Sequence, residues 1–216
     1  MSHFRTDYDH PMANRRYHHG NLRRALMDAA LELVAEKGPD GFTMAAAGRR
    51  AGVSSGAPYK HFPDRAALMK ALCLEGFENL NAAVAVAAAE APTAIEGFRR
   101  VGIAYVKFAA ENPGYFRVMN MPEYAMSASM DGPDQAYWVA VRAALDRLPA
   151  DQRLDPEDPL WITLAARVLV HGLASMFVSG QLGAIGISAD RAEQLADVIT
   201  FAASLIDQAQ REPPQS

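Results

Sequence analysis

Apolar residues recur at helical spacing along almost the whole chain after residue 20, and this pattern restricts the fold more than any other feature of the sequence. In the first such stretch, Leu22, Leu26, Ala29 and Leu33 share one face of a helix that we expect to end at Gly38. The sequence has no stretch in which apolar and polar residues alternate as in a strand, and single Gly and Pro residues separate the periodic stretches. The sequence therefore predicts an all-α fold of about nine helices.

The expected helices are separated by connections that contain Gly, Pro or several polar residues. We predict helices over residues 21–37, 43–51, 55–61, 64 onward, 93–111, 114–121, 133–148, 157–181 and 189–210. Thr43 and Asp64 are suited to cap two of these helices at their N-termini. We expect a flexible tail at 1–13, a small N-terminal domain at 14–63 and a larger helical domain at 64–211.

Charge is distributed unevenly between the two predicted domains. The whole chain has a formal charge of −4, which by itself argues weakly against a nucleic-acid partner. However, residues 1–70 carry 11 Lys and Arg against 7 Asp and Glu, whereas residues 71–216 carry 10 against 18. A basic N-terminal part favours binding to DNA, because neutralised phosphates supply most non-specific affinity. A chance distribution of charge is the alternative.

Several classes of protein are disfavoured by what the sequence lacks. Cys73 is the only cysteine, so we expect a reducing compartment. The N-terminus has no apolar signal stretch and no apolar run is long enough to span a bilayer, so we expect a soluble cytoplasmic protein. No nucleophile elbow, phosphate-binding loop, dinucleotide fingerprint or metal-spaced cluster is present. We therefore expect no enzymatic activity, no cofactor and no metal.

The segment from Thr43 to Phe62 has the pattern of a helix-turn-helix. Two expected helices are separated by the three-residue turn Ala51-Gly52-Val53, in which the glycine accepts the backbone angles and the valine fills the gap between the helices. The second helix of such a unit enters the major groove of DNA. An ordinary helical hairpin remains the alternative for the turn alone.

The second helix of this motif would present several hydrogen-bonding side chains to DNA. Pro58 falls in its first turn, where a missing N–H costs no hydrogen bond, and Tyr59, Lys60 and His61 follow with groups suited to phosphates or base edges. Four arginines, Arg15, Arg16, Arg23 and Arg24, also crowd the start of the first helix, where cations oppose the helix dipole. A compensating anion such as phosphate would explain them, and a solvated basic face is the alternative.

These motifs resemble the N-terminal domain of the TetR (tetracycline-repressor-like) family. The resemblance lies in Tyr17-His18-His19-Gly20-Asn21-Leu22-Arg23, in the turn, and in Ala57-Pro58-Tyr59-Lys60-His61-Phe62-Pro63-Asp64. The later run Asn112-Pro113-Gly114-Tyr115-Phe116-Arg117, with Trp161 and His171-Gly172, resembles the C-terminal domain called WHG. The resemblance covers residues 17 to 208.

The resemblance implies a homodimer that reads an operator and is released by an effector bound in its C-terminal domain. The residues expected to contact or border DNA are Arg15, Arg16, Arg23, Thr43, Ser54, Ser55, Gly56, Pro58, Tyr59, Lys60, His61 and Arg65. The chain departs from the family pattern at Ala45, Ala46 and Ala47, where larger residues are usual, and at Gly48, where alanine is usual. Glycine inside a helix costs about 1 kcal/mol, so we expect the head to be less rigid than is typical of the family.

The last two expected helices suit a two-fold interface. The segment 161–176 is apolar nearly all round, so we expect its helix to be buried on more than one side, and 189–210 carries one clean apolar stripe. Together the two helices suit an interface in which both copies form a four-helix bundle. The core of a monomer would explain the same pattern.

Large residues of the C-terminal domain could line an effector pocket. The candidates are Phe77, Tyr105, Phe108, Met119, Tyr124, Trp138, His171 and Phe177, with Phe98, Phe116, Met121 and Met126 in a wider set. Each of these taken singly is more often a core residue than a pocket residue. The sequence thus predicts a ligand-responsive transcriptional regulator that acts as a repressor, with partners in double-stranded operator DNA, a small-molecule effector and a second copy. A DNA-binding architectural or partner-dependent regulator without an effector is the alternative.

Overall fold

The structure is a computed structural model that describes residues 22–124 and 159–211. Its α-helices are α1 (Leu22–Lys37), α2 (Met44–Arg50), α3 (Arg65–Ala89), α4 (Ala94–Glu111), α5 (Pro113–Met119), α8 (Pro159–Val178), α9 (Gln181–Ala184) and α10 (Ala192–Arg211). Three 3₁₀ turns accompany them, η1 (Pro39–Gly41), η2 (Pro58–Lys60) and η3 (Ala189–Arg191). No strand occurs in these ranges, so the predicted all-α fold is confirmed. The expected tail at 1–13 and the expected helix at 133–148 lie outside the described residues.

The first helices begin and end where the sequence predicts. The Thr43 side chain accepts a hydrogen bond from the Ala46 N–H at 3.1 Å and so caps α2, and Asp64 caps α3 by accepting from Ala67 at 2.7 Å. Gly52 follows α2 with a φ of 73°, a left-handed conformation that favours glycine. The N–H of Val53 then donates to the carbonyl of Gly48 at 2.9 Å, which closes the helix end. These local bonds fix the predicted turn.

The expected helix at 55–61 is a correction, because the structure forms only the 3₁₀ turn η2 there. The N–H of Lys60 donates to Ala57 at 3.2 Å and that of His61 donates to Pro58 at 3.0 Å, both three residues back. Gly56 and Pro58 explain the difference. Glycine disfavours helix through its backbone entropy, and proline has no N–H with which to extend an α-helical ladder.

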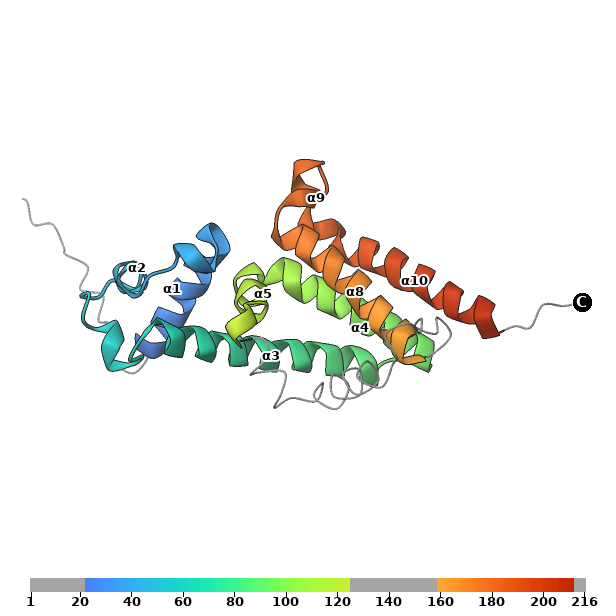
Figure 1. The fold of residues 1–216 in the computed structure, drawn as a ribbon, viewed down its shortest axis with the longest axis horizontal. Coiled ribbons are helices and arrows are strands. Elements are labelled where there is room, and N and C mark those ends of the chain that lie inside the picture. The colour runs from blue at the N-terminus through green and yellow to red at the C-terminus, as the bar shows by residue number, and fades with distance from the viewer. Residues whose placement is uncertain (1–21, 125–158, 212–216) are drawn as a thin grey trace, which may run out of the picture.

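α3 is the long helix along one side of the molecule (Figure 1). α1 and α2 lie at its N-terminal end, and α4, α8 and α10 lie toward its other end, with α10 extending past it. α5 lies between α1 and this second group. We call residues 22–64 the head and residues 65–124 with 159–211 the body. Within the described ranges, no helix has the length and apolarity needed to cross a membrane.

Two hydrophobic cores hold the described helices together, and α4 and α5 contribute to both. The first core joins α1, α2, α3 and α5 with Phe108 of α4, and it includes Leu26, Val34 and Leu72. The second joins α4, α5, α8, α9 and α10. On α5 the neighbouring side chains of Tyr115 and Phe116 are buried in the first and the second core respectively.

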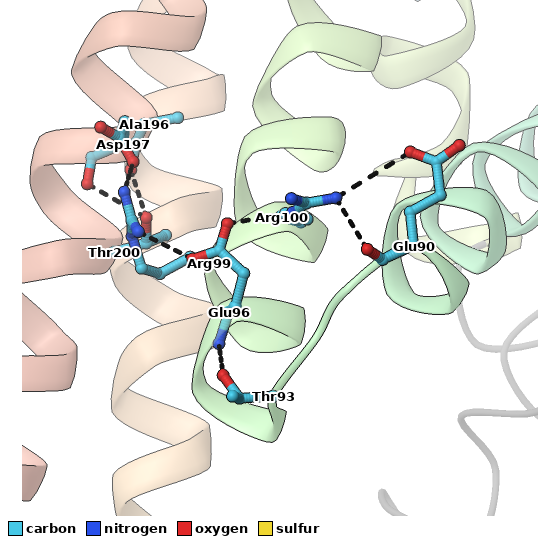
Figure 2. A network of polar contacts seen from close by, with 8 residues as sticks. All are labelled: Glu90, Thr93, Glu96, Arg99, Arg100, Ala196, Asp197 and Thr200. Carbon is cyan, nitrogen blue, oxygen red and sulfur yellow. Dashed lines mark hydrogen bonds and ion pairs between the residues drawn. The ribbon is translucent and has the colours of Figure 1, made fainter.

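A polar network ties α4 to α10 at the second core (Figure 2). Arg99 forms ion pairs with Glu96 at 2.8 Å and with Asp197 of α10, and Arg100 bonds Glu96 at 3.0 Å. Thr93 caps α4 by accepting from the Glu96 N–H at 3.2 Å. The hydrogen bonds and ion pairs lower the pKa of Glu96, the one with Arg100 first. This network sets the register between α4 and the last helix.

Candidate nucleic-acid interface and its connection to the body

The turn η2 presents its polar side chains outward. We call the exposed set Ser54, Ser55, Tyr59, Lys60 and His61 the recognition face. Tyr59 is 54% exposed, so its ring and hydroxyl are accessible from outside the molecule. Gly56 is exposed with no atom near the position of a Cβ, and Thr43 is exposed beside the start of α2. The recognition face therefore offers two serine hydroxyls, a phenol, an ammonium group and an imidazole on one accessible turn.

Pro58 has a different part from its neighbours on the turn, because its ring is buried. A Cβ atom on Gly48 would lie 3.0 Å from the Cγ of Pro58, so the ring sits in the notch that the glycine leaves on α2. Pro58 is thus corrected from a DNA-contact residue to an anchor that holds η2 against α2. The same contact explains why this chain has glycine at position 48.

The arginines of the head are engaged to different degrees. The exposed Arg23 lies over the ring of Phe62, with 4.9 Å between the guanidinium carbon and the ring centroid, and so borders η2. Arg65 is half-buried, and its Nη2 donates to the carbonyl of Pro39 at 2.8 Å. Its other N–H groups lie near the start of α3. Arg15 and Arg16 lie outside the described residues.

Arg24 has its compensating anions within the chain, which corrects the expectation that phosphate would supply them. Its guanidinium pairs with Glu75 of α3 and donates from Nε to Asp28 at 2.8 Å. The hydrogen bond with Asp28 is the main cause of a raised Arg24 pKa. Tyr115 of α5 donates to the same Glu75 carboxylate at 2.7 Å, and burial raises the pKa of this tyrosine. Arg24 thus joins α1 to α3 and α5.

A second exposed surface lies on α8 and α10, and it is apolar. We define the apolar face as Val168, Leu169 and Met176 of α8 with Val198 and Phe201 of α10, which are between 39% and 63% exposed. The opposite sides of the same helices are buried in the second core, for example through Leu173. Both helices therefore offer apolar residues in two directions, as the sequence predicted for the segment 161–176.

The predicted pocket residues do not gather around one cavity. Phe108 and Met119 are buried in the first core, and Phe77 and Tyr124 pack against it. Phe177 packs against the second core. Trp138 and Met126 lie outside the described residues.

His171 is held inside the body by two aromatic neighbours. Its Nδ1 is hydrogen-bonded to the Tyr105 hydroxyl at 2.9 Å, and its ring stacks on Phe116 with 5.4 Å between centroids. Burial lowers the pKa of His171, so the neutral imidazole is favoured. These contacts give His171 a packing role between α4, α5 and α8.

A cleft of about 530 Å³ separates the head from the ends of α5 and α8. Pro39 and Asp40 line its head side, while Phe116, Arg117 and Ser179 are among the residues on its body side. Its size falls in the range of small-molecule sites, about 300–1,000 Å³. Of the wider set of pocket candidates, Phe116 and Met121 line it, but none of the described residues in the main set does.

The comparison with known families agrees with this geometry. Residues 26–72 match the family described as bacterial regulatory proteins, tetR family, and residues 98–201 match the tetracyclin repressor-like C-terminal domain. The chain belongs to the TetR family of transcriptional regulators. The resemblance inferred from the motifs is therefore confirmed, and the first match spans the helix-turn-helix and the start of α3.

Solved structures of other proteins have the same fold. A protein with unknown function from Rhodococcus sp. RHA1 is 32% identical, with 90% of this chain and 98% of that chain covered and a TM-score of 0.60. The TetR family regulator PfmR from Thermus thermophilus is 19% identical, with 82% and 96% covered and a TM-score of 0.59. The fatty acid degradation regulator FadR from Bacillus halodurans is 17% identical, with 85% and 95% covered and a TM-score of 0.59. No curated protein matches the sequence.

Sequence reasoning missed Arg117, which the structure places at the junction of head and body. Its Nη1 donates to the carbonyl of Val34 in α1 at 3.3 Å, and its Nη2 donates to the carbonyl of Val178 in α8 at 2.8 Å. The sequence showed Arg117 as the last residue of the run that resembles the WHG domain, but nothing in that run assigned it a role at the junction.

Proposed function

We propose that this TetR-family regulator is a repressor, that it binds operator DNA as a homodimer through the recognition face, and that a small molecule bound in the body releases it. The observation that carries the proposal is the recognition face itself. Tyr59, Lys60 and His61 are exposed on a turn whose backbone is anchored by the buried Pro58. Direct contact with base edges and phosphates requires a backbone that is held in place and polar side chains that are accessible. A regulator of bacterial genes works in the cytoplasm.

The apolar face supports the homodimer. Large apolar side chains exposed on two helices that pack together favour an interaction surface in soluble proteins. A second copy satisfies it with the same patch, because a two-fold interface pairs each surface with itself. The two copies of α8 and α10 would then form a four-helix bundle, with one head on each side.

Chain order supports the release by an effector. α3 begins at Arg65, directly after the recognition turn, and continues into the body through Ala89. A ligand that changes the tilt of α3 changes the separation of the two heads. Dimeric readers contact half-sites about 34 Å apart, so a displacement of a few Å prevents both heads from binding at once. The cleft beside Pro39 and Arg117 is one place for such a ligand.

The DNA-binding proposal is tested by selecting bound sequences from random duplex DNA with the purified protein. We expect a two-fold symmetric site, and we expect the double variant Tyr59→Ala, Lys60→Ala to bind it about 100-fold more weakly, since each lost base or phosphate contact costs roughly 1–3 kcal/mol. Lys107→Ala on α4 is the matched control and leaves affinity unchanged. Equal binding by the double variant would show that the recognition face is not the reading surface.

The effector proposal is tested on the selected operator with a panel of small molecules. We expect at least one compound to lower operator affinity while it raises the melting temperature of the free protein. A panel in which compounds bind the protein but leave operator affinity unchanged favours the architectural or partner-dependent regulator instead.

A further inference from the structure

The junction between head and body is organised around one side chain, Arg117. It lies in the last turn of α5 and is half-buried. Its two terminal nitrogens reach two different helices, α1 through the carbonyl of Val34 at 3.3 Å and α8 through the carbonyl of Val178 at 2.8 Å. Both carbonyls lie in the last turn of their helices, where backbone oxygens can accept hydrogen bonds from groups outside the helix.

The electrostatics of this arrangement favour a cation at that position. Three helices, α1, α5 and α8, end near the guanidinium, and each C-terminus carries the negative end of a helix dipole. The carbonyl of Val34 also accepts the N–H of Gly38 at 2.9 Å, which closes α1. A planar guanidinium with several donors can bond two carbonyls at once, which a single ammonium does less well.

The packing around Arg117 makes α5 follow α1 closely. A Cβ on Gly114 would lie 2.5 Å from the carbonyl oxygen of Leu31, so the start of α5 touches the backbone of α1. One position further on, Tyr115 joins the pair Arg24–Glu75. The link between α5 and α8 passes beside the open cleft, where Ser179 and Asp40 face the same space. Beside this cleft, Arg117 bonds the last turns of both α1 and α8.

We propose that Arg117 is a positioning residue that clamps the DNA-reading head to α8, and so sets the distance between the two heads of the dimer. The inference rests on the proposed function, because α8 carries the apolar face through which the dimer would form. The clamp links that interface to α1 by one residue, without passing through α3. When α8 shifts, Arg117 carries the shift to the last turn of α1, and the recognition face moves with the head.

The clamp is tested first without DNA, by hydrogen exchange on the full-length protein. Arg117→Met keeps the apolar stem and removes every donor, and we expect the Gly38 amide to exchange at least about tenfold faster, since hydrogen bonds from a charged group are each worth more than about 1 kcal/mol. Arg191→Met in η3 is the matched control, because Arg191 is exposed and bonds only its near neighbour Gln194 at 2.7 Å in the described structure. Unchanged exchange at Gly38 in Arg117→Met overturns the clamp.

The positioning role is tested with operators whose half-sites are moved apart or together by one base pair. The wild type is expected to discriminate against both by at least about tenfold, because each base pair shifts a half-site by about 3.4 Å along the duplex and rotates it. We expect Arg117→Met to lose most of this discrimination and Arg117→Lys to recover part of it. A variant that weakens binding equally at all spacings shows a merely structural role and overturns the proposal.

The two experiments separate this inference from the proposed function. If the wild type binds no symmetric site, the homodimeric repressor is wrong, and the exchange of Gly38 still decides whether Arg117 holds α1. If Arg117→Met does not fold, the partial variant Arg117→Lys replaces it in both measurements, with a smaller change expected in the same direction.

Discussion

The recognition face and the apolar face are both exposed, but the chain stabilises them in opposite ways. On the recognition face the backbone is fixed by contacts a few residues apart, such as the Thr43 cap and the buried Pro58, while the side chains are free. On the apolar face the helices are fixed by distant contacts, such as the pair between Arg99 and Asp197, and the exposed side chains are hydrophobic. The first surface is built by contacts within the head, whereas the second is the surface on which the proposed homodimer rests.

The largest expected effect is on the apolar face. Val168→Asp places a charge where a second copy is expected to bury Val168, and an uncompensated buried charge costs several kcal/mol. We expect dimerisation to weaken by about 1,000-fold and operator binding to fall with it. Analytical ultracentrifugation measures the first and a binding titration the second. The matched control is Val86→Asp on α3, where valine is similarly exposed at 59%, and a loss of dimer in both variants would contradict the assignment of the face.

A smaller effect is expected where the head depends on a local cap. Thr43→Ala removes the oxygen that accepts the Ala46 N–H, and we expect a loss of about 1 kcal/mol in the free energy of unfolding. Denaturant titration measures it. Thr43→Ser keeps the oxygen and is expected to restore most of the loss, so equal destabilisation by both variants would show that the cap is not the cause.

Gly48→Ala should separate stability from DNA binding in the head. Alanine is favoured over glycine inside a helix by about 1 kcal/mol, so we expect the melting temperature to rise or stay level. The new Cβ lies 3.0 Å from the Pro58 ring and has to displace it by a few tenths of an ångström, so operator affinity is expected to fall a few-fold. Gly97→Ala on α4, whose Cβ would meet only ordinary contacts, should change neither affinity nor spacing preference. Unchanged operator binding by Gly48→Ala would refute the notch.

The smallest expected effect concerns pH and belongs to the body. Because burial lowers the pKa of His171 in the folded chain, the unfolded chain takes up the proton first as the pH falls below its usual value of about 6.5. Stability from this residue is therefore complete above that value and declines as the pH falls toward the lower, folded pKa. We expect the melting temperature to drop more between pH 7.5 and 5.5 in the wild type than in His171→Gln. Parallel curves would assign the pH dependence to other groups.

The same contrast explains how much of the molecule could be predicted from its sequence. Helix starts at Thr43 and Asp64 and the turn at Gly52 depend on residues within three or four positions, and the sequence predicted them correctly. The family followed from the same local motifs. The prediction of an α-helix at 55–61 was wrong, because Gly56 and Pro58 favour the shorter 3₁₀ turn that forms there.

The contacts that join the head and the body could not be predicted, because their partners lie far apart in the sequence. The partner of Arg24 is Glu75, 51 residues away, and Arg117 bonds backbone carbonyls that lie 83 and 61 residues away. Carbonyls are present at every residue, so no side-chain pattern marks which of them an arginine will meet. For the same reason the pocket candidates, chosen by size and type, were found mainly in the cores rather than along the cleft.

The double membership of α5 has a consequence for how the chain melts. Tyr115 and Phe116 are consecutive, yet each is buried in a different core, so neither core can come apart without pulling a side chain out of the other. Heating should then produce one cooperative transition instead of separate steps for the head and the body. A fragment that stops before Pro113 would lack the cover over the first core, which makes the reading unit dependent on residues that follow it by some fifty positions.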